Sequence, residues 1–360
     1  MNDYGEKYQR IPEPNKVSGL SYVFTDTGLE LPVLDITHPL FEASIDEKIL
    51  TELCAKSPQA AAMMKMMPDA QKKMIADHSY IFGTHFYETP AAYLSGMGTY
   101  MLKLGPQLIG GGEERKIDRM ATMGVSGIAA RMRLRDLCRL QTEALSPQLR
   151  VRPGDRLCLI NIAGGAASDS INTLRLIQEE DPSLLMDRRI EIHLFEIDAL
   201  SSRFAEKSVK ALKEPGCAFQ KLDLTYQFHR TAWSETAELT NLLISRGNDI
   251  VVCSSEGGLF EYGQDEDIHA VLKTLNDHSS GSTIAVGSAL LDRGRIDPTI
   301  TAMAETSGAA LRFLGKEGIQ DILAPTGWAM DGLYQNNPVY LVFRLKKCRD
   351  WENRSSHSNE

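Results

Sequence analysis

Small, amide and acidic residues follow four apolar segments of the chain, at positions where they could bind one ligand. The four segments have the length and apolar character of buried strands. If the strands are parallel, their carboxyl ends lie along one edge of a sheet, where ligands of such sheets bind. A single carboxylate there is commonly solvated, but recurrence after successive strands predicts a site. The residues are Asn161, Ala163, Gly164, Gly165, Glu196, Asp198, Asp223, Leu224, Ser255 and Glu256.

These residue types suit a nucleoside. The small residues 163–165 would let a ligand approach the backbone at the start of a helix, whose first N–H groups lack intrahelical partners. Glu196 and Asp198 point to one side of the chain, and a carboxylate there could accept hydrogen bonds from both hydroxyls of a ribose. Asp223, beside Leu224, suits the amino group of an adenine.

The turn at residues 163–168 distinguishes between two kinds of nucleoside cofactor. A dinucleotide with a pyrophosphate requires glycine at each position of Gly-x-Gly-x-x-Gly, because a Cβ atom would obstruct the phosphates or the helix. The equivalent positions here are Ala163, Gly165 and Ser168, so only one of them is glycine. S-adenosylmethionine carries no phosphate, and the turn therefore favours it over a nicotinamide cofactor.

Three residues are candidate proton acceptors at this site: Glu256, Tyr262 and His85. A base is required only if the acceptor group is protonated at the working pH, as a phenol is and a carboxylate is not. Each candidate has a structural alternative, because a lone histidine or tyrosine more often packs within the protein. No cluster of Asp and Asn follows the fourth and fifth strands, so we expect no metal ion.

Strand-like and helix-like segments alternate in the second half of the chain. This alternation predicts parallel strands joined by right-handed helical crossovers. We expect an α/β fold, a Rossmann-like, seven-stranded, mostly parallel sheet with helices on both faces. The expected strands are Leu157–Ile162, Ile190–Ile197, Ala218–Leu224, Asp249–Ser254, Ser282–Ala289, Ile322–Ala324 and Pro338–Leu345. The expected helices include one that ends near Glu180, and Ser202–Leu212, Glu235–Arg246, Asp265–Asn276 and Asp297–Leu314.

The first part of the chain is expected to be mainly helical. Ile45–Ala76 has a helical pattern, interrupted at Pro58 and Pro68. Tyr80–Tyr100 is rich in aromatic residues, which could line an acceptor pocket or fill a core. Residues 1–30 are expected to form an arm over the body or a frayed tail. The expected divisions are 1–117, an N-terminal lid and substrate region; 118–348, a cofactor-binding domain; and 349–360, a disordered tail.

A long helix is expected from Asp118 to Leu145, ended by Pro147. Arg131, Arg135 and Arg139 recur along it at intervals of four and so share one side. Such a row is usually a solvated face. One of its guanidinium groups could instead bind a ligand carboxylate through two hydrogen bonds.

Four short motifs together resemble a known family, the class I S-adenosylmethionine-dependent methyltransferases. Within it they are most similar to the leucine carboxyl methyltransferase-like branch, which includes polyketide O-methyltransferases. The resemblance implies a sheet closed by a final antiparallel strand, and a cofactor carboxylate held by Arg131. Ala163, in place of a glycine, and Tyr262, one residue beyond the family's spacing, depart from the pattern. The motifs are Ala130-Arg131-Met132-Arg133-Leu134-Arg135-Asp136, Ile160-Asn161-Ile162-Ala163-Gly164-Gly165, Phe195-Glu196-Ile197-Asp198 and Ser255-Glu256-Gly257-Gly258-Leu259.

Composition narrows the class of protein. The chain has 360 residues and a net charge of −9, which argues against binding nucleic acid through a basic surface. Its six cysteines include no Cys-x-x-Cys pair. No apolar run reaches the ~18 residues needed to span a bilayer. We expect a cytoplasmic protein with no membrane or nucleic-acid partner, and leave open whether it is a homodimer.

The sequence thus predicts an S-adenosylmethionine-dependent methyltransferase. The acidic charge, the aromatic N-terminal region and the resemblance to enzymes that methylate oxygen indicate a small, largely apolar or aromatic acceptor. We expect transfer to a hydroxyl or carboxyl oxygen of a metabolite, as in secondary metabolism. Two alternatives stay open, a nicotinamide-dependent oxidoreductase on the same architecture and a protein that binds S-adenosylmethionine without methylating.

Overall fold

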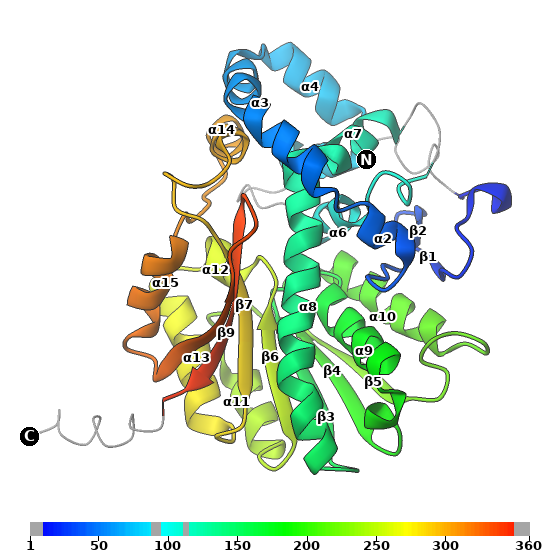
Figure 1. Cartoon of the computed structure of the whole chain (residues 1–360), viewed down its shortest axis with the longest axis vertical. Helices are drawn as coiled ribbons and strands as arrows, with labels where there is room; N and C mark the ends of the chain where they lie inside the picture. The colour runs from blue at the N-terminus through cyan, green and yellow to red at the C-terminus, as the bar shows by residue number, and fades with distance from the viewer. Residues whose placement is uncertain (1–9, 88–94, 111–114, 349–360) are drawn as a thin grey trace, which may run out of the picture.

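A seven-stranded sheet forms the centre of the protein (Figure 1). The structure is a computed structural model that describes residues 10–87, 95–110 and 115–348, and of residues 84–87 only the backbone. The strand order is β5-β4-β3-β6-β7-β9-β8, and every pair is parallel except those of β9, which runs antiparallel to β7 and β8. The expected sheet is therefore confirmed. The strands are β3 Leu157–Ile162, β4 Arg189–Phe195, β5 Asp223–His229, β6 Ile250–Ser255, β7 Ile284–Leu290, β8 Trp328–Tyr334 and β9 Tyr340–Lys347.

Helices cover both faces of the sheet, because the central strands are apolar on both sides. All six residues of β3 are buried. Leu157 and Leu159 belong to the core cluster that includes Leu174 of α9 (Ser168–Glu180), whereas Ile160 belongs to the cluster that includes Val271 of α13 (Asp265–His278). A strand that is buried on both faces reads as a continuous apolar run, which is why its sequence had no polar alternation.

The remaining helices surround this sheet. The longest, α8, crosses the sheet in Figure 1 and contacts α9, β7 and β9. Above the sheet in that view lie α3 and α4, and α3 contacts α14. The bounds are α2 Pro39–Ala43, α3 Glu47–Met66, α4 Asp69–Asp77, α5 Tyr80–Tyr87, α6 Gly96–Leu104, α7 Lys116–Met123, α8 Val125–Val151, α10 Ala199–Lys213, α11 Ala237–Ser245, α12 Leu259–Tyr262, α14 Pro298–Ser307 and α15 Gly315–Leu323.

The N-terminal elements share a core with the sheet. Phe41, Ile81 and Met101 are buried in the same cluster as Ile160 and Phe343. Among the described residues, none of the helices combines the length and the apolar character that crossing a membrane requires. The division at residue 117 stays a prediction, and the expected tail at 349–360 lies outside the described residues.

Two of the expected strands are wrong. The segment 218–222 forms turns, because Gly216 has a φ of 82° and Phe219 N–H donates back to the carbonyl of Leu212. Strand β5 therefore begins at Asp223, one residue before the expected strand Ala218–Leu224 was to end. The segment 322–324 ends helix α15, since Ile319, Ile322 and Leu323 bury one helical side. The missing strand is β8, further along the chain.

Helix boundaries also differ from expectation. Pro58 and Pro147 lie inside α3 and α8, which continue through them. The expected helix from Asp118 is divided at Gly124 into α7 and α8. The expected helix 297–314 ends at Gly308, whose φ of 71° is the left-handed conformation that stops a helix. The expected N-terminal arm contains a small hairpin, β1 (Tyr22–Phe24) and β2 (Glu30–Pro32), and β1 packs on α10.

Candidate functional site

A cavity of about 720 Å³ opens at the carboxyl ends of β3, β4 and β6. Segments that follow these strands form one wall, and residues of α5, α6, α8 and α14 contribute to the others. Its walls are largely apolar, with a few charged side chains, as is usual for small-molecule sites. The charged lining residues are Lys103, Arg133, Glu196, Asp198, Arg230, Glu256 and Glu261, and the larger apolar ones include Ile81, Phe82, Met97, Leu102, Ile300, Met303 and Leu311.

The turn after β3 forms the part of this wall where small residues are obligatory. Ala163 has a φ of 54° and Gly165 a φ of 58°, the left-handed region that glycine favours. Ala163 therefore differs from the family's pattern in residue type, but its backbone has the conformation that a glycine would adopt there. A Cβ on Gly164 would lie 1.5 Å from Oδ1 of Asn161. A Cβ on Gly258, which follows β6, would lie 2.3 Å from that of Ala163, so the two turns pack directly together.

Glu196 lies beside this turn at the end of β4. Its carboxylate accepts hydrogen bonds from the backbone N–H groups of Gly165 at 3.1 Å, Ile197 at 2.8 Å and Asp198 at 3.1 Å. Burial raises the pKa of Glu196, although these donors favour the ionised form. Asp198 caps α10 through the N–H of Leu200 and also lines the cavity. Both expected carboxylates therefore reach one site.

A buried charged network crosses the cavity wall. Lys103 Nζ is 2.7 Å from Glu256 Oε2, and Arg133 Nη2 is 3.2 Å from Glu256 Oε1. Arg133 Nη1 also donates to Glu261 Oε1 at 2.8 Å, and its guanidinium carbon lies 4.3 Å from the ring centre of Tyr340. All four charged side chains are at most 7% exposed. Three elements distant in sequence are joined by this network.

Comparisons with known proteins bear on the fold. No family model and no curated protein matches the chain. A possible exported protein from Bordetella parapertussis has a similar structure, with 14% identity, a TM-score of 0.51, and coverage of 87% of this chain and 98% of that one. A 1,6-didemethyltoxoflavin-N1-methyltransferase from Burkholderia thailandensis, crystallised with S-adenosylhomocysteine, also matches, with 10% identity, a TM-score of 0.40, and coverage of 60% of this chain and 78% of that one.

The arrangement of the sheet identifies the fold. The sheet has seven strands, and the last strand in the sequence, β9, lies between β7 and β8 and runs antiparallel to both. The family resemblance implies such a final antiparallel strand. The chain has the class I methyltransferase fold. Within this methyltransferase fold the cavity lies at the strand ends where a ligand is expected to bind.

The methyltransferase resemblance assigned the cofactor's carboxylate to Arg131, and the structure corrects this. Arg131 is 1% exposed and donates to the backbone carbonyls of Ser44, Leu102 and Thr122 at 2.8–3.1 Å. It does not line the cavity. Ala130 and Arg133 do, because residues three apart share a side of a helix and Arg131 lies on another. Sequence reasoning missed Arg133, although it stands two residues further along the same motif.

Four other expected ligand residues do not line the cavity. Asn161 lies beneath the turn and donates from Nδ2 to Asp169, and Ser255 Oγ accepts from Leu259 N–H at 3.2 Å. Both side chains support the turns from inside. Asp223 and Leu224 begin β5, so they lie at its amino end, and the expected adenine contact there is wrong. The residues that follow β5 and do line the cavity are Arg230 and Trp233.

The candidate bases have different outcomes. Glu256 and Tyr262 line the cavity. His85 belongs to α5, but its side chain lies outside the described residues. Glu261, which the sequence did not single out, lines the cavity as well. Its position next to Tyr262 on α12 was the available signal.

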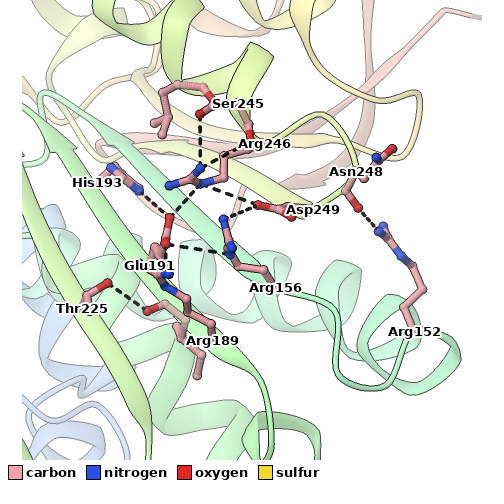
Figure 2. A network of polar contacts seen from close by, with 12 residues as sticks. Arg152, Arg156, Arg189, Glu191, His193, Thr225, Ser245, Arg246, Asn248 and Asp249 are labelled. Carbon is pink, nitrogen blue, oxygen red and sulfur yellow. Dashed lines mark hydrogen bonds and ion pairs between the residues drawn. The ribbon is translucent and has the colours of Figure 1, made fainter.

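A second polar network lies at the amino ends of the strands, at the other edge of the sheet (Figure 2). The carboxylate of Glu191 forms ion pairs with Nε of Arg189 at 2.9 Å and with Nε of Arg246 at 2.8 Å. The side chains of Cys158, Glu191 and His193 offer ligand atoms within 4.8 Å of one another. Because guanidinium groups already neutralise Glu191, a further cation would be repelled there. We assign this network a structural role.

Asp169 should make stability depend on pH. It is fully buried beneath the turn, and burial raises its pKa from 3.8 to about 6. Since the native state then binds a proton more readily than the unfolded state, stability falls as pH rises between these values. We expect the Asp169→Asn variant, whose amide oxygen can still accept, to show a flatter slope in urea unfolding from about pH 4 to pH 6. Parallel slopes would contradict the shifted pKa.

Proposed function

We propose that this protein is an S-adenosylmethionine-dependent methyltransferase that acts on an oxygen of a small, largely apolar or aromatic acceptor. The observation that supports this most is the cavity of about 720 Å³. It joins the turn after β3 and the carboxylate of Glu196 to an apolar wall from α5 and α14. A cofactor and an acceptor held in one cavity can be aligned for a displacement from which water is excluded.

The residues present fit the cofactor. The turn at Ala163–Gly165 leaves room beside the backbone, and Glu196 has the position expected for a ribose partner. We assign the cofactor's carboxylate to Arg133 in place of Arg131. The cavity is lined by four carboxylates and three cationic side chains, a balance that favours a ligand with net positive charge. When bound, the cofactor supplies an electrophilic methyl group on a sulfonium.

The class of acceptor is proposed from the apolar residues of the cavity. Phe82 of α5 and Met303 of α14 line it, together with Leu311. These side chains would bury an aromatic or aliphatic body and leave a polar group to orient it. We accordingly propose that the region 1–117 contributes to acceptor binding. We also propose a cytoplasmic location, because all six cysteines are free thiols.

Binding of the cofactor is the first test. S-adenosylmethionine or S-adenosylhomocysteine should raise the melting temperature, since a ligand at one hundred times its Kd stabilises the native state by about 2.7 kcal/mol. NAD⁺ and NADPH should give no shift. The Glu196→Gln variant should need more S-adenosylmethionine for the same shift. A folded protein that responds to the nicotinamide and not to S-adenosylmethionine would indicate the oxidoreductase, and binding without turnover of any acceptor would indicate the non-catalytic protein.

A further inference from the structure

Two glutamates of the cavity wall differ in how fully they are paired. Both oxygens of Glu256 are occupied, one by Lys103 and the other by Arg133. Glu261 shares only Arg133, through Oε1. Within the described residues no hydrogen bond or ion pair reaches Oε2 of Glu261. Because Glu261 lines the cavity, this second oxygen is the one available to a ligand.

Glu261 is connected both to the turn after β6 and to the segment that carries an apolar residue of the cavity. It belongs to the short helix α12, which begins directly after Gly257 and Gly258. Its backbone carbonyl accepts a hydrogen bond from Arg312 N–H at 2.9 Å, which ties it to the segment that carries Leu311. Because Glu261 lines the same cavity as the turn after β3 and as Leu311, we infer that its carboxylate can reach an acceptor bound there.

We propose, on the basis of the methyl transfer proposed above, that Glu261 is the catalytic base for an acceptor hydroxyl. The hydroxyl oxygen forms a bond to the methyl carbon, and the carbon–sulfur bond breaks with its electron pair remaining on sulfur. The hydroxyl proton passes to Oε2 of Glu261 and later to solvent. The products are a methyl ether and S-adenosylhomocysteine, so atoms and charge balance.

The surroundings of Glu261 suit a base that works near neutral pH. Arg133 of α8 and Lys103 of α6 favour its ionised form, whereas burial and the charge of Glu256 oppose it, and Tyr340 of β9 packs on Arg133. Burial is the largest of these effects and raises the pKa of Glu261 to about 7. A base is most effective when its pKa lies near the operating pH.

Kinetics with two kinds of probe acceptor test this proposal. We would assay the wild type and the Glu261→Gln variant with a panel of phenols and a panel of benzoic acids. Transfer to phenols should fall about 10²–10⁴-fold in the variant, the range typical for loss of a general base. Transfer to benzoic acids, which are already ionised, should change little and serves as the internal control. Equal losses for both panels would indicate a structural role and overturn the proposal.

The pH profile of the wild type gives a second readout that needs no variant. The value of kcat/KM for phenols should rise through about pH 7, and that for benzoic acids should not, because only phenols transfer a proton. Calorimetry should show that the variant still binds S-adenosylmethionine, since the ribose and turn contacts are unchanged, and the assay is run at saturating cofactor so that a change in the pairing of Arg133 does not enter the comparison. A flat profile for phenols would overturn the assignment.

A titration without any acceptor separates this proposal from the proposed function. In protein labelled with ¹³C at the glutamate carboxyls, one NMR resonance should titrate near neutral pH and be absent in Glu261→Gln. If every glutamate titrates near its ordinary value, Glu261 is not the base. If S-adenosylmethionine does not bind the wild type, the methyltransferase proposal fails instead, whatever the titration shows.

Discussion

Replacing Arg131 by methionine is expected to lower the free energy of unfolding by about 3–5 kcal/mol, because a buried charged group and its hydrogen bonds are lost together. The guanidinium donates to carbonyls of Ser44, Leu102 and Thr122, which belong to three separate parts of the chain. Methionine keeps most of the side-chain volume but leaves these buried acceptors unpaired.

Urea unfolding, followed by circular dichroism, measures this loss. Arg139→Met is the matched control, since Arg139 lies two turns further along α8 and is exposed, and it should change stability by no more than about 0.5 kcal/mol. The family resemblance makes the opposite prediction for Arg131, namely normal stability with weaker cofactor binding. That pattern would show that Arg131 reaches the cofactor after all.

Replacing Gly164 by alanine should destabilise the protein by about 3 kcal/mol or more and abolish cofactor binding, because the new Cβ overlaps buried atoms. That Cβ would lie 1.5 Å from Oδ1 of Asn161, whose side chain is fully buried and bonded to Asp169. Asn161 lies within β3 and cannot withdraw without disturbing the strand. The turn itself would have to move, and with it the wall of the cavity.

Thermal unfolding with and without S-adenosylhomocysteine would show both effects. Gly281→Ala is the control, since a Cβ at Gly281 meets no atom within 4 Å and its φ is not positive. It should leave the melting temperature and the ligand shift unchanged. A Gly164→Ala protein that melts normally and still responds to the ligand would mean that the turn tolerates more than its packing indicates.

The sequence by itself determined the class of fold, the central strands of the sheet and the turn at its centre. The expected strand, Leu157 to Ile160 with Ile162, corresponds to β3, because a strand buried on both faces is an apolar run that ends where small residues begin. Glu196 and Asp198 reach the cavity for a similarly local reason. Residues that directly follow a parallel strand must lie at the carboxyl edge of the sheet.

The local sequence pattern did not predict the strand positions where an apolar segment forms a turn or a helix in place of a strand. Around Phe219 the chain carries apolar residues that turn conformations bury, and the strand begins several residues later. The sequence reading therefore placed Asp223 at the wrong end of β5. A strand displaced along its own direction moves its terminal residue to the opposite edge of the sheet, so an error of a few residues reverses the functional conclusion.

Only the tertiary structure decided which charged side chains share the cavity. Along α8, a single residue separates Arg131 from Arg133. Arg131 donates to backbone carbonyls, whereas Arg133 pairs with Glu256 and Glu261. The hydrogen bond from Lys103 to Glu256 joins residues 153 positions apart. The rotation of a helix about its axis is set by what packs against it, and the partners of α8 come from distant parts of the chain.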